Sequence, residues 1–245
     1  MSFIVLIPAR LKSTRLPSKP LLDIGGKSLI QRVFENSSFS DAEGVFVATD
    51  HESIVENCNS FGAESILTNV NHHSGTDRLS EAASILGLKK ETIIVNVQGD
   101  EPFVDPADIN QLGYLFENYQ NIEMGTLYTK LKKEEEDNPN VVKIWVDINK
   151  QVKGFSRKKD FLKNKNLIRL KHLGLYSFRV SFLEEFVSLK RTSSELNERL
   201  EQLRALENGK LILALASKLN SYLGIDTPAD LKLARTRILD DKNKK

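Results

Sequence analysis

Residues 3–21 read FIVLIPARLKSTRLPSKPL, an apolar run that leads directly into a basic, proline-rich loop. The run from Phe3 to Ile7 is short, continuous and rich in Ile and Val, which is typical of a strand covered on both faces of a parallel sheet. Four cations and three prolines follow between Pro8 and Leu21. Ligands of such sheets bind at the carboxyl ends of the strands, so we expect this loop to contact a ligand.

Further strand-like runs alternate with segments of helical period along the chain. The runs are Val45 to Thr49, Glu64 to Leu67 and Ile93 to Val97. This alternation favours an α/β fold with a largely parallel sheet. After about residue 125 the pattern changes: Val142, Ile144 and Val146 alternate with Lys143, Trp145 and Asp147. Such alternation predicts a strand with one face in water, and hence a mixed sheet or a smaller second lobe.

The apolar spacing also predicts several helices and a loop. One helix follows Ser28, and another, with an apolar face from Ile109 to Tyr119, begins at Asp105-Pro106. A third carries leucines from Leu196 to Leu206 and ends at Asn208-Gly209, before a strand over 211–216. A last helix follows Thr227-Pro228, and the lysine-rich stretch 158–171 is expected to be a solvated loop.

Composition narrows the class of protein. The 245 residues are 40% hydrophobic and carry 35 basic and 33 acidic residues, a net charge of +2. This balance gives no reason to expect binding to nucleic acid or to an anionic membrane, and no apolar stretch approaches membrane-spanning length. The single cysteine, Cys58, fits the apolar face of a helix and allows no disulfide within the chain. We therefore expect a cytoplasmic globular protein.

The basic loop is the best candidate for binding phosphate. Gly25-Gly26-Lys27-Ser28 suggests a phosphate-binding P-loop, but that motif needs a glycine where this chain has Leu21, so a turn before the next helix explains the glycines. Arg10, Arg15 and Lys19 can instead converge, since the prolines restrict the loop backbone. Guanidinium groups match pairs of phosphate oxygens, and lysine adds a compact charge.

A second signal is Gln98-Gly99-Asp100, which follows the strand ending near Val97. Gly99 would allow close backbone approach to a ligand, and Asp100 suits Mg²⁺, which takes one or two carboxylates together with substrate phosphates. Asp226 could supply a second carboxylate, or it could be a turn or capping residue before the last helix. The segment 74–78 could hold a nucleotide at the start of a helix near Leu79.

Other chemistries lack their motifs. His72 and His73 are adjacent and have no third ligand at zinc spacing. Neither a G-x-S-x-G nucleophile elbow nor a G-x-G-x-x-G dinucleotide fingerprint occurs in the sequence. The hydrolase and dehydrogenase interpretations therefore lose their support.

An ordered set of motifs resembles the 3-deoxy-manno-octulosonate cytidylyltransferase family, also called CMP-Kdo synthetases. The resemblance covers nearly the whole chain and is far more specific than any single motif. The matching stretches are Ile7-Pro8-Ala9-Arg10, Ser13 to Pro17, Lys19-Pro20-Leu21, Ala48-Thr49-Asp50, Ser74 to Arg78, Asn96 to Pro102, Asn138 to Lys143, Phe155-Ser156-Arg157, His172 to Tyr176, Leu200 to Arg204 and Gly224 to Pro228.

The resemblance implies a Rossmann-like nucleotidyltransferase fold with a mostly parallel mixed sheet and a smaller sugar-binding and dimerisation lobe. It implies an enzyme that uses Mg²⁺ to join CTP to an eight-carbon acidic sugar, 3-deoxy-D-manno-octulosonate (Kdo), giving CMP-Kdo and pyrophosphate for lipopolysaccharide biosynthesis. It also implies a homodimer. We expect one domain over residues 1–245, with a nucleotide-binding core at about 1–125 and 205–240 and a sugar-binding lobe at about 126–204.

The resemblance also assigns roles to individual residues. Catalytic roles are implied for Arg10, Lys19, Asp100 and Asp226, the last two as Mg²⁺ ligands. Nucleotide binding is implied for Pro8, Ala9, Arg10, Arg15, Lys19, Thr76, Asp77 and Arg78. Sugar binding is implied for Gln98, Arg157, His172, Tyr176, Glu201 and Gln202. Among these, Arg157 suits the sugar carboxylate, and His172, Glu201 and Gln202 suit its hydroxyls.

The segment after Arg157 departs from the family pattern. The family has an Ile-Pro pair and a longer loop there, whereas this chain continues Lys158-Lys159-Asp160-Phe161, and Gly154 replaces a tyrosine. The same chemistry on the 8-amino analogue of Kdo or on another acidic sugar therefore stays open. A non-catalytic nucleotide-binding protein is an alternative of another class, but it predicts loss of the metal carboxylates or phosphate cations, all of which are present.

Overall fold

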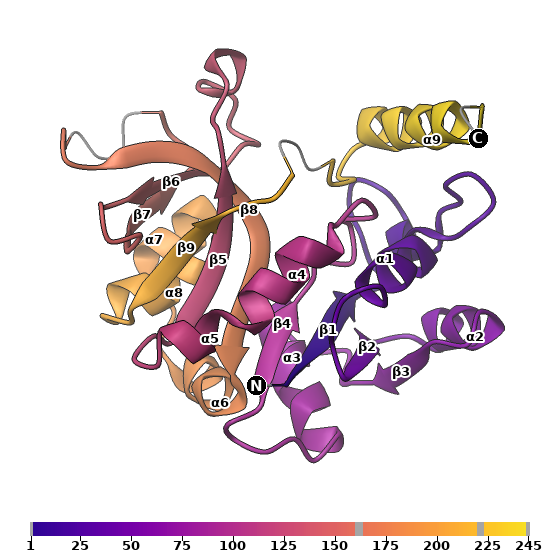
Figure 1. Cartoon of the computed structure of the whole chain (residues 1–245). Helices are drawn as coiled ribbons and strands as arrows, with labels where there is room; N and C mark the ends of the chain where they lie inside the picture. The colour runs from indigo at the N-terminus through magenta and orange to yellow at the C-terminus, as the bar shows by residue number, and fades with distance from the viewer. Residues whose placement is uncertain (1, 160–163, 220–222, 244–245) are drawn as a thin grey trace.

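The computed structural model describes residues 2–159, 164–219 and 223–243 (Figure 1). Its strands are β1 (Phe3–Ala9), β2 (Gly44–Thr49), β3 (Glu64–Leu67), β4 (Ile93–Asn96), β5 (Met124–Thr129), β6 (Lys143–Val146), β7 (Val152–Ser156), β8 (Ile168–Arg179) and β9 (Ile212–Ala216). Its α-helices are α1 (Leu29–Ser37), α2 (Glu52–Ser60), α3 (Gly75–Ile85), α4 (Pro106–Gly113), α5 (Leu115–Asn118), α6 (Val180–Ser188), α7 (Ser193–Glu198), α8 (Gln202–Glu207) and α9 (Pro228–Asn243).

All of these strands belong to one mixed sheet. Its main path runs β3-β2-β1-β4-β8-β5-β9, and β6 pairs with β7 and with β8. Strands β3, β2, β1 and β4 are mutually parallel, and β5 is parallel to β9, whereas β8 runs antiparallel to β4 and to β5. The expected α/β fold with a mostly parallel mixed sheet is confirmed.

Helices cover both faces of the sheet. Side chains of β1 alternate: Phe3, Val5 and Ile7 pack with α1, α2, α4, α5 and α9 on one face, and Leu6 packs with α3, α6 and α8 on the other. Each of these four side chains is fully buried. This burial on both sides explains why the strand reads as a continuous apolar run.

Strand β8 connects the parallel half of the sheet to the second lobe. Its residues 168–171 pair with β6, and its residues 176–179 pair with β4. Between them the pairing with β5 shifts register, so that Thr126 opposes Tyr176 but Leu127 opposes Leu173. Such a bulge bends a strand and re-aims its side chains. The bend lies between two sites expected from the resemblance, His172 and Tyr176.

Most elements expected from the sequence are confirmed, including the four strands of the parallel half, the strand over 211–216 and the last helix. Ser28 caps α1, its side chain accepting from the Gln31 amide, behind a turn in which Gly25 and Gly26 have φ of 67° and 89°. Cys58 is buried on α2 as expected.

Two expected helices are each broken in two. The segment behind Asp105 forms α4 and α5, and Gly113 at the break packs so closely that a Cβ there would lie 2.3 Å from the Phe3 ring. The leucine-rich segment forms α7 and α8, which are separated at Arg199, a residue with φ of 53°. Leu196 is consequently 59% exposed. The leucine spacing in the sequence predicts one continuous helix and does not indicate the break at Arg199.

The expectation of a strand with one face in water over 142–147 is wrong in one respect. Strand β6 forms there, but both of its faces are buried, with Lys143 0% and Trp145 2% exposed. The Lys143 ammonium is satisfied inside by the backbone oxygens of Asn138 and Arg157, at 2.7 and 2.9 Å. A buried lysine with carbonyl acceptors has the same sequence pattern as a solvated one.

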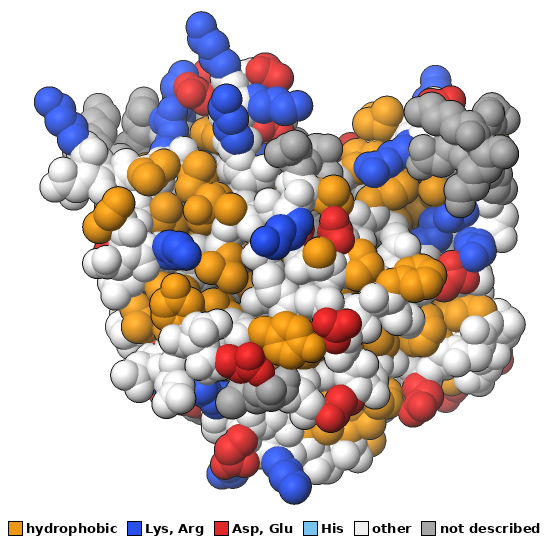
Figure 2. Space-filling view, in the orientation of Figure 1, with side chains coloured by type: hydrophobic (Ala, Val, Ile, Leu, Met, Phe, Trp, Pro, Cys, Tyr) orange, Lys and Arg blue, Asp and Glu red, His pale blue; other side chains and the backbone are white. Residues whose placement is uncertain are grey.

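The lysine-rich stretch 158–171 is not simply a solvated loop. Residues 168–171 begin β8, and residues 160–163 lie outside the part that the structure describes. Lys159 pairs with Glu136 and Asp137, and Lys171 pairs with Glu135. At this end of the molecule, basic and acidic side chains lie side by side (Figure 2).

Candidate active site

The Lys19 ammonium is the centre of a polar cluster at the carboxyl ends of β1 and β4. Its Nζ lies 2.6 Å from Asp100 Oδ2, 3.1 Å from Asp226 Oδ1 and 2.8 Å from the Ile225 carbonyl oxygen. Burial disfavours the ammonium, but the Asp100 and Asp226 charges and hydrogen bonds outweigh it, so the pKa of Lys19 is raised. Three segments far apart in sequence therefore meet at one charge.

The backbone fixes the relative position of the two aspartates. The Ile225 amide donates to the Asp100 carbonyl at 2.9 Å, which ties the segment before α9 to the loop after β4. Asp230 accepts from the amides of Asp226 and Thr227, and Thr227 Oγ1 accepts from the Asp230 amide. Thr227 and Asp230 thus cap α9 reciprocally. The Asp226 carboxylate is left to pair with Lys19 and Arg15 rather than to cap the helix.

Glu101 adds a third carboxyl group beside the two aspartates. Its Oε2 is buried and has no hydrogen-bond partner among the residues that the structure describes. Burial raises the pKa of Glu101 to about 8, and the nearby Asp100 and Asp226 charges add to the effect. The group is therefore mainly protonated at neutral pH, which limits the negative charge that gathers around Lys19.

The rest of the basic loop is more open. Arg10 is exposed, and Arg15, with its side chain 56% exposed, donates to Asp226 Oδ1 at 3.0 Å. The start of the loop is anchored, because the Leu11 amide donates to Asp50 Oδ1 at 3.0 Å. Arg10 and Arg15 are thus accessible to an anion in solution, and their binding of phosphate stays a prediction.

The segment 74–78 lies inside the first turn of α3, not before a helix that starts near Leu79. Ser74 caps α3 by accepting from the Asp77 amide. Arg78 is 3% exposed and donates to Asp50 and to Thr68, so its guanidinium is committed to internal partners. Burial lowers the pKa of Arg78, and the Asp50 charge opposes this lowering. The Arg10 charge lowers the pKa further, which indicates that Arg10 lies near Arg78.

Two close approaches of the backbone bring the loops together. A Cβ at Gly99 would lie 2.7 Å from the Pro8 carbonyl oxygen, so only glycine fits beside the end of β1. A Cβ at Gly75 would lie 3.6 Å from the Pro8 ring. Pro8 and Ala9, which is 4% exposed, thus form the floor between the loop after β4 and the start of α3.

One of the residues assigned to the sugar, Glu201, is joined by a hydrogen bond to the segment assigned to the nucleotide. Thr76 Oγ1 donates to Glu201 Oε2 at 2.6 Å, which links α3 to the residue before α8. Burial and then Glu201 raise the pKa of Tyr176, and the Arg157 charge opposes them. Arg157 and Glu201 therefore both lie near the Tyr176 phenol.

Gln98, His172 and Gln202 are positioned by their neighbours. The Gln98 amide donates to Asn96 Oδ1, and its side chain lies beside Gly174 of β8. Gln202 is 4% exposed at the start of α8. His172 is 8% exposed and stacks edge-on against Phe155, and burial lowers its pKa to about 3.

The tautomer of His172 follows from its bonds. Thr126 Oγ1 lies 2.8 Å from the Leu175 carbonyl and 3.0 Å from His172 Nε2. The hydroxyl proton is used by the carbonyl, so Nε2 carries a proton and donates it to Thr126, which leaves Nδ1 as the acceptor. A neutral imidazole here can accept a hydrogen bond but brings no positive charge to an anionic ligand.

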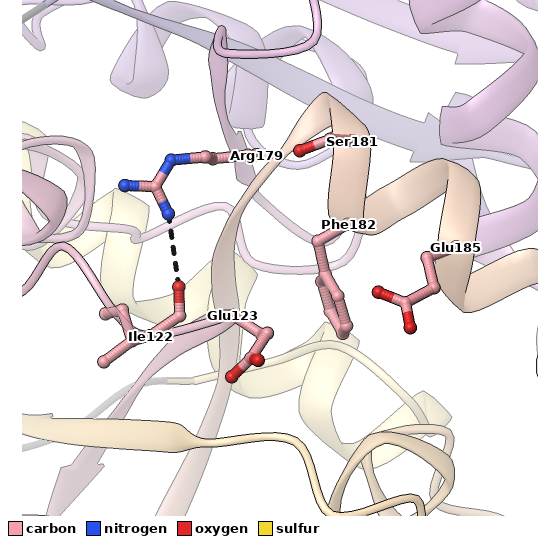
Figure 3. Close-up of a pocket in the computed structure, with 6 residues that line it drawn as sticks. All are labelled: Ile122, Glu123, Arg179, Ser181, Phe182 and Glu185. Atoms are coloured by element: carbon pink, nitrogen blue, oxygen red, sulfur yellow. Dashed lines mark hydrogen bonds between the residues drawn. The ribbon is translucent and has the colours of Figure 1, made fainter.

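A separate hollow of about 170 Å³ lies away from these residues (Figure 3). It is lined by Ile122, Glu123, Arg179, Ser181, Phe182 and Glu185. Because Arg179 pairs with Ile93 at the start of β4, the hollow lies at the opposite edge of the sheet from Lys19. The Arg179 guanidinium donates to the Ile122 carbonyl at 3.2 Å.

Sequence reasoning missed three residues that position candidate site residues or lie beside them. Asp50 anchors both Leu11 and Arg78, Glu101 lies beside the aspartates, and Glu198 contacts Ser156 and Arg157. Asp50 and Glu101 each follow a buried strand, which is a signal that could have singled them out. Glu198 lies in a helix whose end the leucine pattern did not predict.

Comparison with known proteins agrees with this arrangement. A family model described as cytidylyltransferase matches residues 4–212. A 3-deoxy-manno-octulosonate cytidylyltransferase of Haemophilus influenzae is 41% identical over 249 residues, which cover 96% of this chain and 98% of the relative. One from Saccharophagus degradans is 41% identical over 253 residues, covering 97% and 99%.

A solved structure is also similar over nearly the full length. It is a CMP:2-keto-3-deoxy-manno-octonic acid synthetase in complex with CTP, with a TM-score of 0.90 and 33% identity, covering 98% of this chain and 100% of that one. The resemblance noted in the motifs is therefore confirmed over the whole chain.

Replacing His172 with glutamine should make the free energy of unfolding less dependent on pH. An unfolded histidine takes up a proton near its ordinary pKa of about 6.5, whereas folded His172 stays neutral, so protonation favours the unfolded chain as pH falls. From this group alone the wild type should lose about 2 kcal/mol of unfolding free energy between about pH 7 and pH 5. Urea unfolding of both proteins at the two pH values checks this, and equal losses would contradict it.

Proposed function

The chain belongs to the 3-deoxy-manno-octulosonate cytidylyltransferase family, and we propose that it transfers CMP from CTP to Kdo, releasing pyrophosphate. The observation that carries this proposal is the convergence on Lys19 of Asp100 and Asp226, beside the Thr76–Glu201 hydrogen bond that joins the two halves of the site. The product would serve lipopolysaccharide biosynthesis.

The reaction makes and breaks one bond at phosphorus. The anomeric hydroxyl of the sugar attacks the α-phosphorus of CTP, the bond to the β-phosphate oxygen breaks, and pyrophosphate leaves with that electron pair while the hydroxyl loses its proton. Such a transfer depends mainly on positioning two anionic substrates and on neutralising the charge of the leaving group. The site must therefore supply fixed cations on one side and a rigid sugar pocket on the other.

The cations of the basic loop suit the triphosphate. Lys19 and Arg15 donate to carboxylate oxygens in this structure, so the same donors can pass to phosphate oxygens without loss of charge pairing. Arg10 is exposed at the start of the same loop. Arg78 pairs internally with Asp50, so we assign it the role of shaping the nucleotide pocket together with Thr76, Asp77, Pro8 and Ala9.

Asp100 and Asp226 fit Mg²⁺ by the chemistry of their donors. Both carboxylates lie within 3.1 Å of one ammonium nitrogen, so they already hold a compact cation between them. Mg²⁺ prefers one or two carboxylates together with phosphate oxygens and water. These two residues would hold it, and the bound ion would neutralise phosphate charge and orient the α-phosphate.

The second half of the site suits an acidic sugar. Arg157 carries a positive charge near Tyr176 and can pair with the sugar carboxylate, while Gln98, Glu201 and Gln202 offer hydrogen bonds to hydroxyls. Neutral His172 would accept from a hydroxyl rather than bind the carboxylate. We assign nucleotide binding to residues 1–125 and 205–240 and sugar binding to 126–204.

The substrate CTP indicates the cell compartment in which the reaction takes place. CTP is a nucleotide of the cell interior, so we assign the enzyme to the cytoplasm, where the lone buried Cys58 would stay reduced. Within the described ranges, no helix has both the length and the apolar character needed to cross a bilayer.

Incubation with CTP, Mg²⁺ and Kdo should release pyrophosphate and yield CMP-Kdo. Parallel reactions would contain 8-amino-Kdo or a sialic acid, with the products identified by mass. Because the segment after Arg157 is shorter than in the family, the ratio of kcat/KM for Kdo to kcat/KM for 8-amino-Kdo is the informative quantity. Product from the amino sugar alone would move the specificity there, and no product from any of these sugars would contradict the proposal.

The variant Asp100→Asn should lose most of its turnover, by about two orders of magnitude or more, because the amide removes a charge that the cation and Lys19 both need. Asp240→Asn is a matched control, since Asp240 is exposed on α9. Steady-state pyrophosphate release at several Mg²⁺ concentrations measures the loss. Near-normal Mg²⁺-dependent turnover in Asp100→Asn would defeat the assignment.

We also propose a homodimer that forms through the lobe of β6, β7 and β8. Two large apolar side chains support this: Ile148, 86% exposed after β6, and Ile168, 53% exposed at the start of β8. Ile168 pairs with Val146 in the sheet, so the two lie on neighbouring segments. We take these two side chains as part of the dimer surface, since contiguous exposed apolar surface marks protein–protein interaction sites.

Light scattering after gel filtration should give twice the mass of the chain for the wild type and a monomer for Ile148→Asp. Phe39→Asp is the control, because Phe39 is 77% exposed but lies on the segment after α1. A monomeric wild type, or an unchanged mass for Ile148→Asp, would contradict this dimer.

A further inference from the structure

Glu198 holds Arg157 in place through both its side chain and its backbone. One carboxylate oxygen accepts from Ser156 Oγ at 2.8 Å, and the other accepts from the Arg157 amide at 3.0 Å. The Glu198 carbonyl accepts from Arg157 Nε, also at 3.0 Å. The end of α7 is thereby joined to the end of β7 at three points.

The backbone reversal after Glu198 makes this contact possible. Glu198 is the last residue of α7, and Arg199 adopts φ of 53° and ψ of 51°. Carbonyls in the last turn of a helix have no partner within the helix. Arg157 Nε satisfies one of them, which directs its guanidinium across the end of α7.

Two further contacts complete the fixing of Arg157. Its Nη1 donates to the Pro139 carbonyl at 3.1 Å. Its carbonyl accepts from Lys143 Nζ at 2.9 Å, and this buried ammonium also binds the Asn138 carbonyl. The amide, carbonyl, Nε and Nη1 of Arg157 are therefore all engaged. Among the described contacts Nη2 has no partner, so Nη2 and the second N–H of Nη1 can donate to a ligand.

The direction in which the Arg157 guanidinium points matters for recognition of a carboxylate. The Arg157 charge acts on Tyr176, which lies on β8 near Glu201. Pairing of a guanidinium with a carboxylate depends on the plane and direction of the donors, and an arginine fixed in advance loses less conformational freedom when it binds. A residue that sets this plane controls how well an acidic sugar is held.

We propose that Glu198 is a positioning residue for the sugar: it orients Arg157 toward the carboxylate of the acidic sugar without touching the sugar itself. This inference rests on the proposed function, since it concerns the sugar half of the same site. The Glu198 carboxylate accepts hydrogen bonds from the Ser156 hydroxyl and the Arg157 amide, and among the described contacts it has none with Lys19, Asp100 or Asp226.

Glu198→Ala tests the proposal by separating the two substrates. Alanine keeps the Glu198 carbonyl that binds Arg157 Nε but removes the carboxylate that holds Ser156 and the Arg157 amide, so the Arg157 backbone can shift and carry the guanidinium with it. We expect the KM for Kdo to rise about tenfold or more, while the KM for CTP stays within about twofold. Glu198→Gln should keep most of the sugar affinity, since its amide oxygen can accept from Arg157 and its amide nitrogen can donate to Ser156 Oγ. Glu207→Ala, on the exposed face of α8, is the control.

A second readout separates positioning from general destabilisation. Kdo at a concentration near the wild-type KM should raise the thermal midpoint of the wild type and of Glu198→Gln clearly more than that of Glu198→Ala, whereas CTP with Mg²⁺ should raise it equally in all three. If the alanine variant does not fold, Glu198→Asp carries the test, because its shorter side chain cannot reach both donors and should give an intermediate KM for Kdo.

The outcomes are distinguishable. An active wild type with an unchanged KM for Kdo in Glu198→Ala, or with both KM values raised equally, would overturn the positioning role and leave the proposed function intact. A wild type that binds CTP but makes no product from Kdo would overturn the proposed function and this inference with it.

Discussion

The pairing of the Lys19 ammonium with Asp100 and Asp226 is the constraint on which the site depends. The three residues come from the loops after β1 and β4 and from the segment before α9, so no local structure could bring them together. A partly buried cation between two carboxylates is favourable only when the geometry is fixed. That geometry is provided by the Ile225–Asp100 backbone bond and the reciprocal cap of α9.

The antiparallel strand β8 supplies the other half of the site. It pairs with β4 at one end and with β6 at the other, and its bulge lies between His172 and Tyr176. The residues that we propose for the nucleotide thus lie mainly at the parallel half of the sheet, while those proposed for the sugar come mainly from β7, β8 and the segment of α7 and α8. The Thr76–Glu201 hydrogen bond connects the two groups.

How far the sequence predicts this arrangement depends on the range of the interaction. Continuous apolar runs and capping residues such as Ser28 revealed the parallel strands and α1, because these signals are local. The meeting of Lys19 and Asp100 could be expected because both follow parallel strands whose carboxyl ends lie at the same edge of the sheet. The break at Arg199, the burial of Lys143 and the inward pairing of Arg78 depend on long-range partners, which leave no mark in local spacing.

A crystal structure with CTP and Mn²⁺ would test the central claim most directly, since anomalous scattering locates the metal. The account predicts a manganese ion bound by oxygens of both Asp100 and Asp226 and by the triphosphate, with Lys19 moved from the carboxylates to phosphate oxygens. A metal bound to the phosphates but to neither carboxylate, with Lys19 still paired to both aspartates, would contradict it.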